Sequence, residues 1–227
     1  MVARGELVKY FLQDSIAPIL EIGAGFGEVV GLLQDSCEKI YALETDHTLF
    51  SVLNAQLVSS HKSATVALPA KLSDLNFYNE MQVIFSFNHF SFLSEHAKNN
   101  EIHSAFRALR EDGYLLASQS QFIADPSHSW TQPEVIFSDK EILLEKKSEI
   151  VSVTNETEYE VNFSFELLFR NLILASAERK SKLYLQGPGK TIEMCLEAGF
   201  SDAWIYGDVF LSPYKPGSSG YVLVARK

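Results

Sequence analysis

Cysteine is scarce in this sequence, since Cys37 and Cys195 are the only two among 227 residues. Two cysteines so far apart do not form the disulfide framework of a small secreted domain, and they fit a reducing compartment. No apolar run approaches the roughly 18 residues that a membrane-spanning helix needs. The first residues also lack the apolar segment of a signal peptide. We therefore expect a cytoplasmic protein.

Positive charge is also in short supply. The chain has 19 Lys and Arg residues against 29 Asp and Glu, a formal net charge of −10. Its densest basic pairs are Lys146-Lys147 and Arg179-Lys180, and an acidic chain without a basic patch is repelled by phosphate backbones. The histidines show no metal-ligand spacing with either cysteine. We expect no nucleic-acid partner, no membrane partner and no metal.

Short apolar runs alternate with helical spacings of apolar residues along the first half of the chain. Runs typical of buried strands lie at residues 19–22, 39–43, 64–68, 82–87 and 114–118. Helical spacings lie at residues 6–14, 47–58 and 100–109, with a further helix directly after Gly27. Such alternation predicts an α/β fold with a doubly wound parallel sheet.

The pattern changes in the second half. Residues 139–169 alternate apolar and polar side chains with period 2, which is typical of antiparallel strands with one wet face. A helical spacing at 191–198 ends at Gly199, and two further strands are expected at 202–206 and 220–225. Because no linker or repeat separates these parts, we predict one domain over residues 1–227, with antiparallel strands inserted at 120–182.

A glycine cluster follows the first predicted strand, in the stretch Glu21-Ile22-Gly23-Ala24-Gly25-Phe26-Gly27. A dinucleotide fingerprint would need its third glycine at position 28, where Glu28 would repel a pyrophosphate. The turn suits instead a ligand that joins an amino acid zwitterion to a nucleoside. Glu21 offers an acceptor for an ammonium group, and Glu44, at the end of the next strand, offers one for ribose hydroxyls.

At these residues the sequence resembles the class I S-adenosylmethionine-dependent methyltransferases. Residues 19–27 look like their first motif, and Tyr41-Ala42-Leu43-Glu44 looks like their second-strand acidic motif. The segments 107–114, 196–208 and 221–227 are similar to a bacterial subgroup whose known members act on small molecules. The resemblance implies a Rossmann-like sheet of seven strands, mostly parallel with the last strand antiparallel, and S-adenosyl-L-methionine as the cofactor, with S-adenosyl-L-homocysteine as the product.

The resemblance also implies which residues bind the cofactor. Those facing its methionine end would be Glu21, Gly23, Ala24 and Gly25, with Gly27 completing the turn. Glu44 would hold the ribose and Thr45 would lie beside the adenine, whose edge would contact Ala70, Lys71 and Leu72. Many members carry Asp near position 70, and this chain has Ala70 instead.

The methyl group would face the residues after the fourth strand, Phe87, Asn88 and His89. A histidine with a pKa near neutrality is a candidate general base, so His89 is the candidate catalytic residue. The alternative is that His89 caps or packs the following helix. Asp125, Pro126, His128 and Trp130, after the fifth strand, form a second candidate site.

These observations favour a methyltransferase that moves a methyl group to an O or N atom of a small molecule by in-line displacement. One alternative is a protein of the same fold that binds the cofactor but performs non-methylating chemistry or regulation. A nicotinamide enzyme and a macromolecular methyltransferase are disfavoured by Glu28 and by the acidic composition. A homodimer through the inserted strands is possible, because antiparallel edges often pair.

Overall fold

The computed structural model describes residues 2–12, 16–60, 65–120, 134–139, 142–155, 157–170 and 172–227. The chain divides into two compact units. The first unit comprises Met1–Gln121 together with Gln186–Lys227, and the second comprises Phe122–Leu185. The predicted insertion at residues 120–182 corresponds closely to the second unit. Describing the whole chain as one domain stays a prediction.

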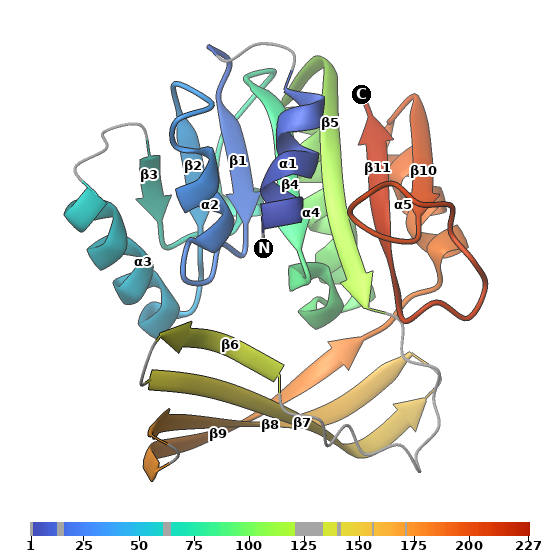
Figure 1. Cartoon of the computed structure of the whole chain (residues 1–227). Helices are drawn as coiled ribbons and strands as arrows, with labels where there is room; N and C mark the ends of the chain where they lie inside the picture. Colours follow the sequence, from blue (N-terminus) through green and yellow to red (C-terminus); the bar gives the residue numbers. More distant parts are fainter. Residues whose placement is uncertain are drawn as a thin grey trace. The chain divides into compact units, whose positions relative to one another are not determined.

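The first unit is built on a seven-stranded sheet in the order β10-β11-β5-β4-β1-β2-β3 (Figure 1). Its strands are β1 (Ile19–Ile22), β2 (Ile40–Leu43), β3 (Thr65–Leu68), β4 (Met81–Phe87), β5 (Leu109–Ser120), β10 (Asp202–Tyr206) and β11 (Gly220–Arg226). The pairs β1–β2, β2–β3, β1–β4 and β4–β5 are parallel, whereas β11 runs antiparallel to both β5 and β10. The predicted sheet, with its last strand antiparallel, is confirmed.

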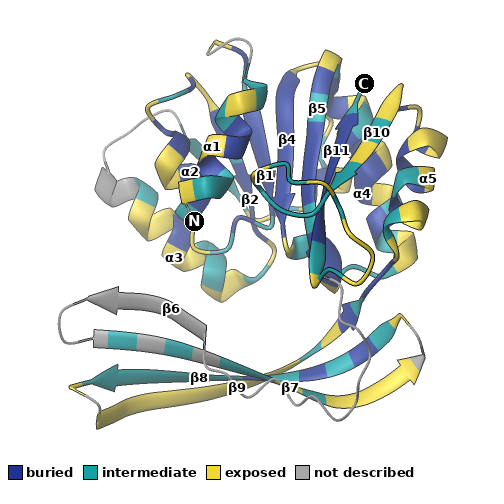
Figure 2. Cartoon of the chain, turned by 45° about the vertical axis from the view of Figure 1, so that its right-hand side comes forward, coloured by how far each residue is buried: buried dark blue, intermediate teal, exposed yellow. Residues whose placement is uncertain are grey.

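Helices cover both faces of this sheet (Figure 2). Their bounds are α1 (Val2–Phe11), α2 (Glu28–Leu33), α3 (His47–Ser60), α4 (Glu95–Ala108) and α5 (Pro188–Ala198), with short 3-10 turns η1 (Leu72–Asp74) and η2 (His89–Phe92). Of the described helices, none is long and apolar enough to cross a bilayer. Because helices lie on both sides, the central strands are buried on both faces, and β4 is buried at every position.

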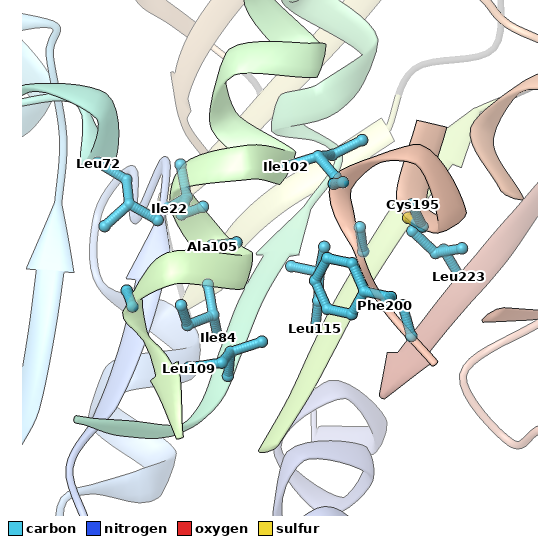
Figure 3. Packing of buried hydrophobic residues seen from close by; sticks show 14 of the residues in the cluster. Ile22, Leu72, Ile84, Ile102, Ala105, Leu109, Leu115, Cys195, Phe200 and Leu223 are labelled. Atoms are coloured by element: carbon cyan, nitrogen blue, oxygen red, sulfur yellow. The ribbon is translucent and has the colours of Figure 1, made fainter. Parts of the chain in front are cut away.

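Alternate residues of each strand supply the two hydrophobic cores. On the face covered by α4 and α5, Ile84 and Leu115 pack with Ile102 and Cys195 (Figure 3). On the face covered by α1, α2 and α3, the intervening strand residues pack with apolar side chains of those helices. Side chains alternate between the two faces of each strand, and both faces pack against helices. The sequence therefore shows continuous apolar runs in these strands.

An irregularity inside β5 precedes the strand that was predicted at residues 114–118. The pairing with β4 shifts register between Met81 and Val83, and Asp112 has φ 61°. At Gly113 an added Cβ would lie 2.8 Å from the backbone oxygen of Arg110, so only glycine fits.

Both ends of the inserted segment are held inside the first unit. The Gln119 side-chain amide, at the end of β5, donates to the backbone oxygen of Gln186 at 3.1 Å. Lys98 of α4 donates to the Gln119 side-chain oxygen at 2.8 Å. The chain thus leaves the first unit close to Gln119 and returns to it at Gln186, and these two residues are hydrogen-bonded to each other.

The second unit is a four-stranded antiparallel sheet in the order β6-β7-β8-β9. Its strands are β6 (Glu134–Asp139), β7 (Ile142–Asn155), β8 (Glu158–Phe169) and β9 (Leu172–Tyr184). Tyr159, Val161 and Phe163 alternate inward along β8 and pack with Leu183 and Leu185. The antiparallel strands predicted from period 2 are confirmed in β7 and β8, and the structure adds β9, whose residues are mostly exposed.

Candidate functional site

A cavity of about 120 Å³ lies in the first unit, beside the carboxyl ends of β1 and β2 and the segment after β4. The strand ends and the loops after β2 and β3 contribute Ile22, Gly23, Leu43, Thr45, Ala70, Lys71 and Ser73. The segment after β4 and helix α4 contribute His89, Leu93, Ala97, Asn100 and Glu101. The carboxyl edge of a parallel sheet is where open α/β folds bind ligands.

The glycine loop between β1 and α2 is tied to the end of β2. The backbone N–H groups of Gly23 and Ala24 both donate to the backbone oxygen of Leu43 at 2.9 Å. Gly23, Gly25 and Gly27 have φ of 72°, 56° and 81°, a region that side-chain-bearing residues rarely adopt. A Cβ on Gly25 would meet nothing within 4 Å, so the loop offers an open surface of backbone there.

The carboxylate of Glu44 fastens this loop. Its Oε2 accepts from the backbone N–H of Gly25 at 2.9 Å, and its Oε1 accepts from the backbone N–H of Asp46 at 2.8 Å. The side chain is largely buried at 7% exposure. Each carboxylate oxygen has a second lone pair, so Glu44 can still accept from ligand hydroxyl groups.

Glu21 lies deeper, at the end of β1. Burial raises the pKa of its carboxyl well above the usual range, and the nearby Arg4 guanidinium opposes this shift in pKa. Its Oε2 is buried without a hydrogen-bond partner among the described residues. The Arg4 guanidinium also stacks over the Phe87 ring at 5.6 Å. An acceptor in this position suits a donor group on a ligand or a water molecule.

After β4, Asn88 takes the left-handed conformation with φ 67°. Ser118 of β5 supports it, because the serine hydroxyl accepts from the Asn88 backbone N–H at 2.9 Å and donates to Asn88 Oδ1 at 3.2 Å. This turn places the His89 ring against the glycine loop, where a Cβ on Gly23 would lie 2.5 Å from His89 Cγ. Burial lowers the pKa of His89, with Glu44 opposing the shift. A neutral imidazole is the form that accepts a proton.

At the other end of the cavity, α4 faces the loop after β3. Glu101 is 3% exposed and accepts from the backbone N–H groups of Ser73 and Leu72. Burial raises the pKa of its carboxyl to about 7, with the Lys71 ammonium opposing the shift. The Glu101 Oε2 atom has no hydrogen-bond partner among the described residues.

The structure brings only part of the predicted site together in the cavity. The predicted residues that line it are Gly23, Thr45, Ala70, Lys71 and His89. Ala24, Gly25, Gly27, Glu44 and Glu21 shape or adjoin the glycine loop without lining it, and Asn88 is exposed. Leu72 and Phe87 are buried in the hydrophobic cores. The second candidate site, Asp125, Pro126, His128 and Trp130, lies outside the described residues.

Sequence reasoning missed the contribution of α4, above all Glu101. A signal was present: residues 98, 101, 105 and 108 recur at helical spacing and are all buried, and two of them are charged. A charged residue on the core-facing side of a helix needs a partner, so this pattern could have identified Lys98 and Glu101 as candidates.

The donors and acceptors of this site fit an adenosyl amino acid. The open glycine backbone suits a zwitterion, and the buried carboxylate at the end of β2 suits a ribose. The cavity, with its unpartnered carboxylate, suits a base. The cavity is smaller than the roughly 300 Å³ of pockets that enclose a whole ligand. A cofactor of this size would therefore also extend along the open glycine loop.

Comparison with known proteins shows what this chain is similar to. Residues 20–117 match a family model described as a methyltransferase domain. The chain superposes on an S-adenosylmethionine-dependent methyltransferase from Clostridium acetobutylicum with a TM-score of 0.77 at 8% identity, covering 99% of this chain and 91% of that one. No curated protein sequence matches this chain.

Two structures of sugar-modifying enzymes are also similar. One is an S-adenosylmethionine-bound amino pentose methyltransferase from Micromonospora echinaspora, with a TM-score of 0.72, 11% identity and coverage of 98% and 88%. The other is a sugar N-methyltransferase from Streptoalloteichus, with a TM-score of 0.73, 13% identity and coverage of 99% and 87%. Residues 20–117 thus match a methyltransferase domain, and the whole chain has the fold of S-adenosylmethionine-dependent methyltransferases.

Proposed function

We propose that this chain is a methyltransferase that uses S-adenosyl-L-methionine to methylate an O or N atom of a small molecule. The observation that carries the proposal is the glycine loop, which Glu44 fastens to the end of β2 beside a cavity. An open glycine loop beside a carboxylate that can still accept from hydroxyl groups is what an adenosyl amino acid requires. The bound cofactor supplies an activated methyl group, so the protein mainly has to orient the reactants and exclude water.

The residues divide this work by position. Glu44 holds the ribose, Thr45 lies beside the adenine, and Gly23, Ala24 and Gly25 form the open loop at the methionine end. Glu21, with its unpartnered Oε2, accepts from the ammonium group directly or through water. Ala70, Lys71 and Leu72 form the wall next to the adenine.

His89 is the proposed general base. It lies between the glycine loop and the cavity, and its lowered pKa keeps the ring neutral near pH 7. A neutral ring nitrogen can take the proton that an attacking amine or hydroxyl loses. Asn88, held by Ser118, sets where the ring lies.

Several observations support a small-molecule acceptor. The net charge of −10 disfavours nucleic acids. Two similar folds are those of an amino pentose methyltransferase and a sugar N-methyltransferase, so amino sugars are the first acceptors to test. Both cysteines are free and buried, which fits the cytoplasm. The second unit is the proposed insertion, through which two copies would pair.

Calorimetric titration with S-adenosylmethionine and S-adenosylhomocysteine tests the proposal, with NAD as the control ligand. We expect micromolar binding of both sulfur nucleosides, loss of that binding in Glu44→Ala, and none of NAD. Glu38→Ala, which removes an exposed carboxylate just before β2, is the matched control and keeps the affinity. Absence of binding by the folded wild type overturns the proposal.

Turnover separates catalysis from binding alone. Formation of S-adenosylhomocysteine in the presence of amino sugars, reduced in His89→Ala with unchanged cofactor affinity, supports methyl transfer. Tight cofactor binding without turnover on amine and hydroxyl acceptors favours the regulatory or non-methylating alternative.

A further inference from the structure

A buried carboxylate in the cavity is only half satisfied. Glu101 is 3% exposed, and its Oε2 lacks a hydrogen-bond partner among the described residues. Leaving a buried charged acceptor without a donor is costly, so such atoms usually face a ligand, an ion or water. Because this atom belongs to a residue that lines the cavity, a ligand there can supply the missing donor.

The position of this carboxylate is fixed from both sides. Its helix, α4, is packed into the core through Ile102 and Ala105, which follow it closely in sequence. From the loop after β3, the backbone N–H groups of Leu72 and Ser73 donate to the same carboxylate. Glu101 is therefore held in place at the cavity without having to reorder its side chain.

The surroundings indicate what kind of donor belongs there. Glu101 is the only carboxylate among the residues that line the cavity, Ala70 has no polar side chain, and Lys71 can only donate. Leu43, Leu93 and Ala97 supply apolar surface next to it. Apolar surface next to a carboxylate acceptor suits an aromatic heterocycle that carries an exocyclic amino group.

We propose that Glu101 recognises the 6-amino group of the cofactor's adenine and selects adenine over a 6-oxopurine. This inference rests on the proposed function, because that function puts an adenosyl group in the cavity. Glu101 would supply from α4 the acidic acceptor that the loop after β3, with Ala70 and Lys71, does not offer. The ionised carboxylate would repel a 6-oxo group, because both groups are acceptors.

The test compares S-adenosylhomocysteine with its hypoxanthine analogue, S-inosylhomocysteine, by calorimetry. A hydrogen bond to a charged group makes the wild type prefer the adenine ligand by about tenfold or more. In Glu101→Gln the side-chain amide can also donate to a 6-oxo group, so the preference falls towards unity or reverses. Glu101→Asp keeps the charge but withdraws the oxygen, so the preference falls without reversing.

The ratio of the two dissociation constants within one variant is the readout, so a general loss of stability does not affect it. Glu95→Gln, an exposed change in the first turn of the same helix, is the control and keeps the wild-type ratio. If Glu101→Gln and Glu101→Asp weaken both ligands equally, Glu101 only supports the Leu72–Ser73 turn and the inference is wrong, while the proposed function stands. If the wild type binds neither ligand, the proposed function fails as well.

Discussion

Gly23 is the residue at which the site tolerates least change. Its φ of 72° and the closeness of the His89 ring, 2.5 Å from an added Cβ, act together. Gly23→Ala should cost about 1–3 kcal/mol of folding free energy through backbone strain. It should also abolish cofactor binding by distorting the glycine loop. Denaturant unfolding and calorimetry measure the two effects.

Gly31→Ala is the natural control for that substitution. Gly31 lies inside α2, where an added Cβ would meet nothing within 4 Å. Alanine is the better helix former, so this variant should be more stable by up to about 1 kcal/mol. Equal effects at the two positions would contradict the role given to the glycine loop.

Two buried charged residues of α4, Glu101 and Lys98, make stability depend on pH in opposite ways. Burial raises the pKa of Glu101 from 4.5 to about 7 and lowers that of Lys98 from 10.5 to about 7. The folded state therefore holds extra protons at Glu101 between pH 4.5 and 7, and it holds fewer at Lys98 between pH 7 and 10.5. Glu101 thus lowers stability as pH rises to 7, and Lys98 restores stability as pH rises further.

Measured unfolding free energies from pH 5 to 10 should show each contribution as a slope. Each group contributes at most about 1.4 kcal/mol per pH unit within its window. Glu101→Gln should remove the fall below pH 7, and Lys98→Met should remove the rise above it. Profiles that keep both slopes in both variants would show that other groups set the pH dependence.

At the scale of elements, the C-terminus of α5 depends on one glycine. Gly199 has φ 108°, and an added Cβ would lie 2.9 Å from the Phe106 ring. That ring also packs edge-on against Phe200 at 5.3 Å between centroids. Gly199→Ala should therefore destabilise the chain by at least about 1 kcal/mol, lowering the melting temperature by about 2–4 °C.

Gly189→Ala provides the comparison on the same helix. Gly189 is exposed near the N-terminus of α5 and has open space around its Cα. If Gly189→Ala lowers the melting temperature as much as Gly199→Ala does, the loss of stability does not come from the C-terminal cap of α5.

The elements predicted well are those whose pattern is local. β1, β2 and β4 are continuous apolar runs between polar turns, and their bounds differ from prediction by one residue at most. Helix α4 begins at Glu95, five residues before its predicted start, because Ser94 caps it by accepting from the Ala97 backbone N–H. The polar first turn of α4 lacks the apolar spacing on which the prediction relied.

Features that depend on neighbours distant in sequence were not predictable in this way. β9 shows no clear alternation, since it lies at the edge of its sheet with most side chains exposed, and only its pairing with β8 makes it a strand. Glu101 enters the cavity because α4 packs beside η1, a contact that no local pattern encodes. Glu44, by contrast, follows directly from its place at the end of a strand.

At the scale of the molecule, the second unit offers a sheet edge. β9 is the last strand of its sheet, and Leu172, Ile173 and Leu174 on it are each at least 60% exposed. Unpaired strand edges with apolar residues tend to pair with another chain. We expect a homodimer by light scattering, and Leu174→Lys should convert it to a monomer, because lysine on an edge strand opposes pairing.

Val151→Lys tests whether the edge itself is responsible. Val151 is 49% exposed on β7, which has a partner strand on each side. This variant should remain dimeric. A monomeric wild type would contradict the predicted dimer outright.

The hydrogen bond between Gln119 and Gln186 has an evolutionary consequence. An inserted segment whose two ends lie side by side behaves like a long loop. Doubling the length of such a loop costs only about 0.6 kcal/mol of loop-closure free energy. Lineages can therefore lengthen, shorten or exchange the whole grafted module while the catalytic framework stays intact.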